Sequence, residues 1–353
     1  MTTPPLPPGS GAGDARLHGI NLGGWLVAGA PPEHLDGFVT AADFERLVNW
    51  RFSHVRLPVD DALLDGADGW LALDRALMAC LGAGLSCVLA LRLPRERRAA
   101  VFASEADRGR LVARWEALAG RYAGAPGGLL FDLLDRPAAP DDLPPEALAA
   151  LGAARLSAPA ARRPPVPGAG AGRAWNALAA RLTQAVRSRD GRHTLVVQSN
   201  GAGPEAFAHL RPTRDPNTIY SFHCFAPRAF TMQGAAPPPA GAPAGAPDAA
   251  SPGPVTYPGM VAGERWDRAR LETLFAPVAE FRRVYRAPAY LGAFGVAAGA
   301  PRSGRLTWLR SVLSLCRAGG IGWAYWTYRG GPFALLERGG PDYDLLGVLQ
   351  SES

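Results

Sequence analysis

Short apolar segments recur along the chain and alternate with longer segments whose apolar residues follow a helical period. The apolar segments cover residues 17–22, 54–59, 85–91, 128–134, 194–198, 218–223, 289–294 and 321–325. Runs of this length, several of them ending in polar or aromatic residues, are typical of buried strands. The segments between them predict helices over 41–50, 70–81, 105–122, 174–187, 268–285 and 304–317. Strands that alternate with helices predict βα units and a parallel sheet.

The number of these units favours a closed barrel over an open sheet. A single (β/α)8 barrel needs about 250 residues and tolerates insertions, and the chain has 353. A dinucleotide-binding sheet is disfavoured because Gly-Gly-Trp at 23–25, after the first strand, lacks the GxGxxG pattern, and Pro204 interrupts a second glycine-rich turn. The expected fold is therefore an α/β (β/α)8 TIM barrel over residues 15–353, with a disordered tail over 1–14 and no cofactor.

Two segments rich in Pro, Ala and Gly interrupt the alternation of strands and helices. One covers about residues 138–172, after the fourth strand, and the other about 234–262, after the sixth. Both follow the carboxyl ends of strands, which is the face where barrel active sites are built. Two interpretations stay open: the insertions are lids over a site, or they are solvated loops without a role.

The composition excludes some classes of protein. Hydrophobic residues make up 48% and charged residues 19%, which is typical of a globular protein and excludes global disorder. The net charge is +6 and every one of the 37 basic residues is arginine, as coding bias in a GC-rich bacterial genome would produce. Nucleic-acid binding is disfavoured because the short basic segment 92–98 contains Glu96 and no interleaved aromatic residue.

The cysteines and the N-terminus bear on metal binding and location. The four cysteines form no CxxC pair and have apolar neighbours, which predicts buried free thiols and no metal site. The N-terminus has neither the charged nor the apolar region of a secretory signal. No apolar run reaches 18 residues without a charge, so no membrane span is expected. The expected location is the cytoplasm.

Six strand-end motifs follow one another in a characteristic order. They are HGINLGGW at 18–25, HVRLPV at 54–59, FDLLDRP at 131–137, YSFHCFAP at 220–227, YLGAFGV at 290–296 and WAYWTY at 323–328. Together they resemble glycoside hydrolase family 5, the cellulase family, over about residues 16–350. The resemblance implies a TIM barrel that hydrolyses β-linked glucans, mannans and related glycosides with retention, using two carboxylates about 5–5.5 Å apart.

The chain departs from the family at both catalytic positions. The family's acid/base is the Glu of an Asn-Glu-Pro motif, and here Asp-Arg-Pro stands at 135–137. The family's nucleophile is the Glu of a Gly-Glu-Phe-Gly motif, and here Gly-Ala-Phe-Gly stands at 292–295. Arg136 stays protonated at any working pH, and Ala293 has no nucleophilic atom. The resemblance therefore implies that both reactive groups are missing.

Other family site positions are kept or altered. Arg56, His223 and Trp326 match family site residues, whereas Phe225 stands where a tyrosine hydroxyl usually contacts the nucleophile. Trp326 is either a platform for a sugar ring or a cap on the barrel core. His223 either hydrogen-bonds a sugar hydroxyl or has a structural role. Asp135 either donates a proton in place of the missing acid or forms an ion pair with Arg136 or Arg56.

Aromatic residues that lie at or after other strand ends have the same two interpretations, sugar subsite or barrel core. These residues are Trp25, Phe230, Tyr257 and Trp266. Three acidic residues, Glu264, Asp267 and Glu337, would reach the site only through loop rearrangements.

Three hypotheses on function stay open. The first is a catalytically inactive relative that binds a saccharide or serves as an accessory in polysaccharide metabolism. The second is an active retaining β-glycosidase with displaced catalytic groups, and the third is a protein-interaction barrel without affinity for glycans. An arginine-filled pocket would favour an acidic sugar, because Arg binds carboxylates bidentately.

Overall fold

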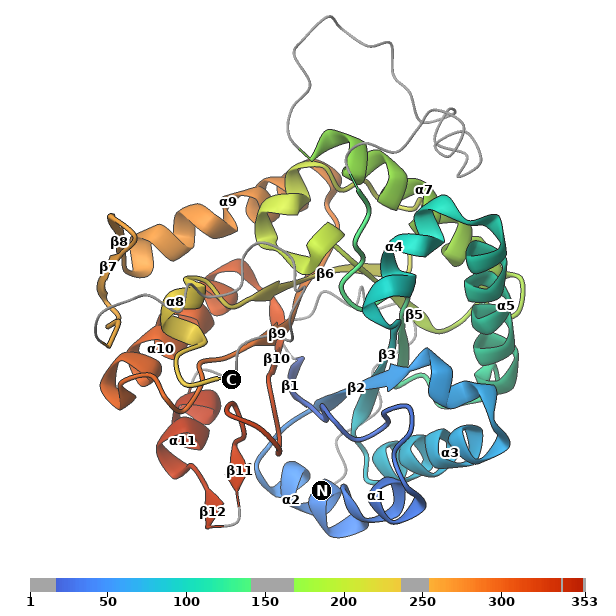
Figure 1. Ribbon diagram of the computed structural model, residues 1–353, viewed down its shortest axis with the longest axis horizontal. Coiled ribbons are helices and arrows are strands. Elements are labelled where there is room, and N and C mark those ends of the chain that lie inside the picture. Colours follow the sequence, from blue (N-terminus) through green and yellow to red (C-terminus); the bar gives the residue numbers. More distant parts are fainter. Residues whose placement is uncertain (1–16, 141–167, 236–253, 338, 352–353) are drawn as a thin grey trace, which may run out of the picture.

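The computed structural model describes residues 17–140, 168–235, 254–337 and 339–351, and its centre is a closed parallel barrel (Figure 1). The barrel strands are β1 (His18–Asn21), β2 (His54–Asp60), β3 (Ser86–Arg92), β4 (Leu129–Asp132), β5 (Thr194–Gln198), β6 (Thr218–Cys224), β9 (Ala289–Phe294) and β10 (Gly322–Tyr325). Their order around the barrel is β1-β10-β9-β6-β5-β4-β3-β2. Every one of the eight lies on a predicted apolar segment, so the predicted TIM barrel is confirmed.

Helices surround the barrel (Figure 1). Six of them cover the predicted helical segments: α2 (Ala41–Asn49), α3 (Ala67–Gly82), α5 (Glu105–Tyr122), α7 (Ala169–Arg187), α9 (Arg268–Tyr285) and α10 (Arg302–Gly319). The sequence did not predict α1 (Pro32–Gly37), α4 (Arg95–Ala103), the short α8 (Arg228–Thr231) or α11 (Tyr343–Ser351). Short 3-10 turns η1 (Asp61–Asp65), η3 (Asn200–Ala202) and η4 (Pro204–Ala208) complete the loops.

Regular structure extends into the ranges given to both insertions. Helix α7 begins at Ala169, inside the range given to the first insertion, because small residues such as Ala171 and Ala174 pack against the core. Strand β7 (Gly259–Val261), inside the range of the second, pairs antiparallel with β8 (Glu264–Trp266), which follows that range. A second small hairpin joins β11 (Leu336–Glu337) to β12 (Gly340–Pro341). The predicted tail at 1–14 and most of both insertions lie outside the described residues.

Successive residues of the strands face two separate cores. Val88 belongs to a small cluster with Leu130, Val196 and Ile219, whereas its neighbour Leu89 belongs to a large cluster that also holds the helix residues. Since side chains alternate across a strand, the small cluster fills the barrel interior and the large one lies between barrel and helices. The same alternation turns the side chains at positions 56, 132 and 198 towards the interior, near the carboxyl ends of their strands.

Two smaller predictions can be compared with the structure. All four cysteines are buried and free, as predicted. Among the described helices, none is both long and apolar enough to cross a membrane.

Candidate functional site

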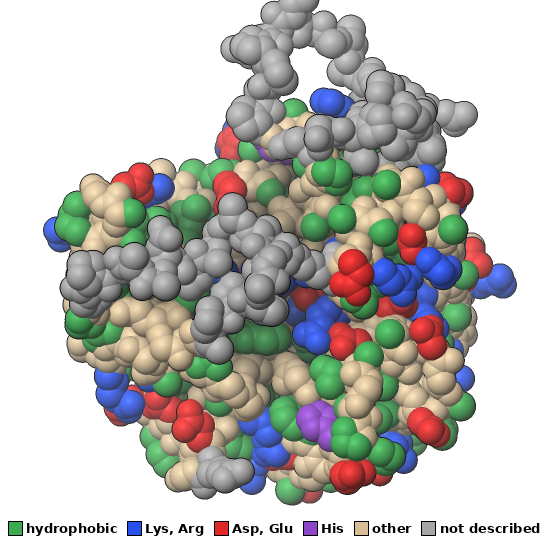
Figure 2. Space-filling view, in the orientation of Figure 1, with side chains coloured by type: hydrophobic (Ala, Val, Ile, Leu, Met, Phe, Trp, Pro, Cys, Tyr) green, Lys and Arg blue, Asp and Glu red, His purple; other side chains and the backbone are tan. Residues whose placement is uncertain are grey.

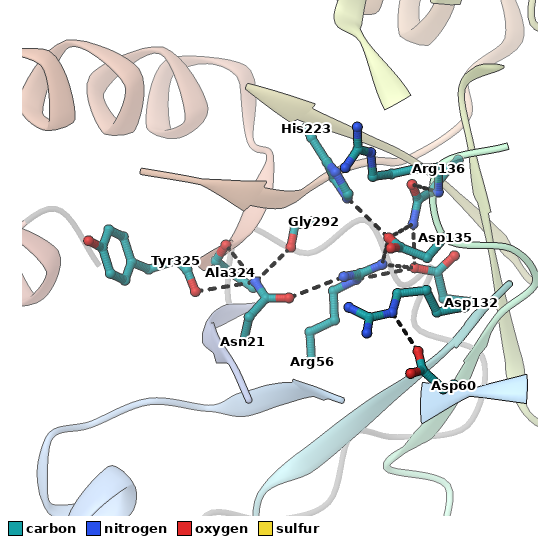
Figure 3. A network of polar contacts seen from close by, with 12 residues as sticks. Asn21, Arg56, Asp60, Asp132, Asp135, Arg136, His223, Gly292, Ala324 and Tyr325 are labelled. Carbon is teal, nitrogen blue, oxygen red and sulfur yellow. Dashed lines mark hydrogen bonds and ion pairs between the residues drawn. The ribbon is translucent and has the colours of Figure 1, made fainter. Parts of the chain in front are cut away.

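A buried arginine shared by two carboxylates lies at the carboxyl end of the barrel (Figure 3). Arg56 comes from β2, Asp132 ends β4, and Asp135 follows it. The Nη2 atom of Arg56 lies 2.8 Å from Asp132 Oδ2 and 2.7 Å from Asp135 Oδ1. All three side chains are at least nine-tenths buried. Of the two ion-pair partners expected for Asp135, the structure shows Arg56.

Two amide side chains extend this network. Gln198 on β5 donates through Nε2 to Asp132 at 2.8 Å, and its Oε1 accepts the backbone N–H of Arg136 at 3.1 Å. Asn21 on β1 accepts from Arg56 at 3.1 Å and donates to the carbonyl of Gly292 at 2.9 Å. The network therefore links β1, β2, β4, β5 and β9. Sequence reasoning missed both amides, although Asn21 lies inside a quoted motif and Gln198 ends a predicted strand.

The two carboxylates that share Arg56 have different electrostatics. Burial alone would raise the pKa of Asp135, but the charges of Arg56 and then of His223 hold it well below the usual value. The pKa of Asp132 is raised, because burial outweighs the attraction of the same guanidinium. Of these two carboxylates, only that of Asp132 has an oxygen, Oδ1, that is buried without a hydrogen bond to the described residues. One guanidinium cannot fully neutralise two buried carboxylates. Its charge stabilises the ionised form of Asp135 more than that of Asp132.

His223 on β6 lies beside this ion pair. Its Nε2 atom is 3.8 Å from Asp135 Oδ1 and makes no hydrogen bond within the described residues. Burial lowers the pKa of His223 to about 3, and the charges of Arg56 and Arg136 contribute to the shift while Asp135 opposes it. The ring is therefore neutral at physiological pH.

The neutrality of His223 leads to a prediction for its titration. We expect the ring to stay neutral from pH 8 down to about pH 4, well below the unperturbed histidine pKa of about 6.5. Since the folded pKa is depressed, this group stabilises the fold above about pH 6.5, and that stability is lost as the pH falls towards 3. Side-chain NMR of the histidines tests this, with His223→Gln assigning the signal. A midpoint between pH 6 and 7 would contradict it.

A cavity of about 880 Å³ opens above the ion pair. Figure 2 shows basic side chains gathered around the hollow at this end of the barrel. The residues at the family's site positions all line it, namely Arg56, Asp135, Arg136, His223, Phe225, Ala293 and Trp326. The sequence did not single out three further charged residues that line it, Asp60, Glu205 and Arg228, and it assigned Arg92 and Arg98 to a short basic segment. In the structure Arg92 forms an ion pair with Asp60 at 2.6 Å.

The cavity has one aromatic wall. Trp326, after β10, is half-buried, and its ring packs on Gly23, where a Cβ atom would come within 2.6 Å of it. Phe225 stands edge-on to Phe333, with ring centroids 5.8 Å apart. Trp25, by contrast, is buried in the core and donates from Nε1 to the carbonyl of Leu35 at 2.8 Å.

The other strand-end aromatic residues also lie outside the cavity lining. Phe230 and Tyr257 are buried, and Trp266 packs under the guanidinium of Arg270. Their positions agree with the interpretation that they belong to the core or to surface packing.

The two positions at which the family resemblance places catalytic glutamates, 136 and 293, line the cavity. Arg136 is exposed and has a left-handed backbone with φ 54°, which is uncommon for a residue other than glycine. Ala293 lies on β9 opposite His223. Neighbouring Gly292 has no side chain to obstruct the site, since a Cβ atom there would lie 2.8 Å from Ser221 Oγ and 3.4 Å from His223 Nε2.

The acidic residues considered as displaced catalytic groups lie elsewhere. Glu264 pairs with Arg270 at 3.1 Å, and Asp267 begins α9 by accepting the backbone N–H of Arg270. Neither of them, nor Glu337 on β11, lines the cavity. Among the described residues, no group of three or more His, Cys, Asp or Glu side chains is arranged to hold a metal ion.

Comparison with known proteins relates this site to a family. The profile of the family described as Cellulase (glycosyl hydrolase family 5) matches residues 19–331. Endoglucanase C of Acetivibrio thermocellus is 26% identical over 347 residues, covering 88% of this chain and 90% of that protein. Cellodextrinase A of Ruminococcus flavefaciens is 24% identical over 327 residues, covering 86% and 83%.

Solved structures share the barrel. Thermotoga maritima Cel5A in complex with cellobiose superposes with a TM-score of 0.72 at 22% identity, covering 95% of this chain and 98% of that one. Cellulose synthase subunit Z from Clostridioides difficile gives a TM-score of 0.72 at 21% identity, covering 94% and 98%. At these identities the superpositions support the fold alone.

Proposed function

This chain belongs to glycosyl hydrolase family 5, the cellulase family, and we propose that it is a catalytically inactive member that binds a saccharide at the carboxyl end of its barrel. The observation that carries the proposal is the state of Asp135. This carboxylate, which lines the cavity, is buried and forms an ion pair with Arg56 at 2.7 Å. An ionised carboxylate held in this way has no proton to give to a leaving group.

The residues around Asp135 support the absence of catalysis. Retaining hydrolysis needs one carboxylic acid and one nucleophilic carboxylate about 5–5.5 Å apart. The family resemblance assigns these roles to positions 136 and 293, where arginine and alanine stand. Of the other cavity carboxylates, Asp60 is paired with Arg92 and Glu205 is an exposed residue of η4. No described pair of free carboxylates faces across the cavity.

Other features support binding. The cavity volume of about 880 Å³ lies within the usual range for small-molecule sites, about 300–1,000 Å³. Trp326 and Phe225 supply an aromatic wall, on which sugar rings stack with their C–H faces. Relatives named endoglucanase and cellodextrinase suggest β-linked glucose oligomers as ligands.

A binding screen that also follows turnover tests the proposal. The purified chain is mixed with cello-, manno- and uronic-acid oligosaccharides, and the dissociation constant and the reducing ends released are measured in the same samples. Binding without product is the expected result. Product would support an active glycosidase with displaced groups, and absence of both binding and product would support a barrel that recognises proteins.

Removing the aromatic wall should weaken binding. We expect Trp326→Ala to raise the dissociation constant of a bound oligosaccharide about tenfold, which corresponds to about 1.4 kcal/mol of lost stacking. Titration calorimetry measures the effect. Trp266→Ala is the matched control, since Trp266 is also half-buried but lies outside the cavity. Equal effects of the two substitutions on the dissociation constant would show that Trp326 does not contact the oligosaccharide.

A further inference from the structure

Arginines outnumber carboxylates in the lining of the cavity. Among the described residues, five arginines line it, Arg56, Arg92, Arg98, Arg136 and Arg228, against three carboxylates, Asp60, Asp135 and Glu205. Arg56 is shared by two carboxylates, Asp132 and Asp135, and Arg92 pairs with Asp60. No described carboxylate forms an ion pair with Arg136 or Arg228, and both residues are exposed. These two exposed guanidinium groups attract anions into the cavity.

Arg136 and Arg228 lie close enough to repel each other. Arg136 follows β4, and Arg228 begins the short helix after β6, so the two come from strand ends separated by β5 alone. The pKa of Arg228 is lowered, first by partial burial and then by the charge of Arg136. Two like charges in one cavity destabilise the empty site, and an anion between them would remove this repulsion.

The backbone holds Arg136 in this position. Its N–H donates to Gln198 Oε1 at 3.1 Å, and the carbonyl of the next residue, Pro137, accepts from Gly201 at 2.6 Å. These bonds fix a left-handed conformation that costs free energy for a residue with a side chain. Figure 3 shows the guanidinium of Arg136 beside the His223 ring, and not with the Arg56 ion pair. The strained backbone thus presents a guanidinium to the cavity.

The apolar part of the cavity lining indicates which kind of molecule bears the anionic group. Trp326 and Phe225 offer flat apolar surfaces, which a bare inorganic ion would not use. A sugar ring with an acidic substituent would use both the aromatic wall and the arginines, because guanidinium groups bind carboxylate and phosphate oxygens in a bidentate way.

We infer that the cavity takes a saccharide bearing an anionic group, and that this group binds between Arg136 and Arg228. The inference rests on the proposed saccharide binding and specifies the class of ligand. The chemistry required is an oxyanion on a sugar ring, as in a uronic acid or a sugar phosphate. The neutral β-glucans suggested by the names of the relatives would then be the poorer ligands.

A matched pair of ligands tests the inference. Cellotriose and its C6-oxidised counterpart, β-1,4-linked triglucuronate, share one backbone and differ in their carboxylates. We expect triglucuronate to bind the full chain at least about tenfold more tightly, as one charge-assisted contact provides. The preference should fall steeply as the salt is raised from about 0.05 to about 0.5 M, because these arginines are exposed and screened.

Two variants test whether Arg136 and Arg228 cause the preference for triglucuronate over cellotriose. The double variant R136Q/R228Q should bind both trisaccharides equally, whereas R283Q, which removes an exposed arginine of α9 outside the cavity, should keep the preference. Near-ultraviolet circular dichroism checks that each variant is folded. A preference that survives in R136Q/R228Q overturns the inference.

The remaining outcomes separate this inference from the proposed function. Cellotriose binding as tightly as triglucuronate would leave saccharide binding in place and overturn the anionic ligand. Binding of neither trisaccharide would overturn both proposals. Inorganic phosphate that competes as strongly as triglucuronate would show a simple anion site, and this too would overturn the inference.

Discussion

Replacing Arg56 by methionine is expected to destabilise the fold by about 3–5 kcal/mol, since removing one partner of a buried ion pair leaves uncompensated charge. Two carboxylates, those of Asp132 and Asp135, would lose their shared cation. Methionine keeps much of the side-chain volume, so the loss reports on charge more than on packing. Chemical unfolding at pH 7 measures the effect.

The pH dependence identifies the cause. In the unaltered chain the depressed pKa of Asp135 stabilises the fold above the ordinary aspartate pKa of about 3.9, and this contribution is lost as the pH falls through the folded pKa. In Arg56→Met both carboxylates should have raised pKa values, so the folded state binds more protons than the unfolded state. The loss of stability relative to the unaltered chain therefore grows from pH 5 to pH 8.

A surface pair provides the control for this prediction. Arg75→Met removes the partner of Asp36 from a pair in which both side chains are more than half exposed, and it should cost about 0–1 kcal/mol at either pH. A deficit for Arg56→Met that stayed small, or did not change with pH, would show that Arg56 is not the counter-ion of the two carboxylates.

The apolar pattern predicted the barrel because each buried strand is a contiguous apolar segment that can be recognised from its own residues. Each strand is a short apolar run, and the six predicted helices have enough buried positions to show a helical period. Helix α4 was missed because it buries only Val101 and Phe102 among charged residues. Helix α1 was missed because it is a six-residue turn that begins at Pro32.

The motif order predicted part of the cavity lining, and for the ion pair of Asp135 it left two partners open, Arg136 and Arg56. Arg56 and Asp135 are far apart in sequence, and their contact depends on the register of β2, β3 and β4. Gln198 and Arg228 belong to no quoted catalytic position, so nothing local distinguished them from other polar residues. Sequence periodicity gives the face of a strand on which a residue lies, whereas partners across strands follow from register.

Restoring both glutamates should produce the largest change in activity. We expect the double variant R136E/A293E to hydrolyse cello-oligosaccharides, with a rate at least about 10²-fold above the unaltered chain, the lower end of what general acid–base catalysis contributes. Both positions line the cavity, so each new carboxylate faces the space that a substrate would occupy. Position 136 keeps its left-handed backbone, which glutamate adopts no less readily than arginine.

The single variants show whether the two positions act together. Neither R136E nor A293E alone should release product, because retaining hydrolysis needs the acid and the nucleophile in the same cavity. Reducing-end release and product analysis measure all three variants against the unaltered chain. Turnover by R136E alone would reveal a nucleophile elsewhere and contradict the proposed loss of catalysis. A folded double variant without turnover would show that the surroundings, above all the Arg56 ion pair with Asp135, have diverged beyond the two reactive groups.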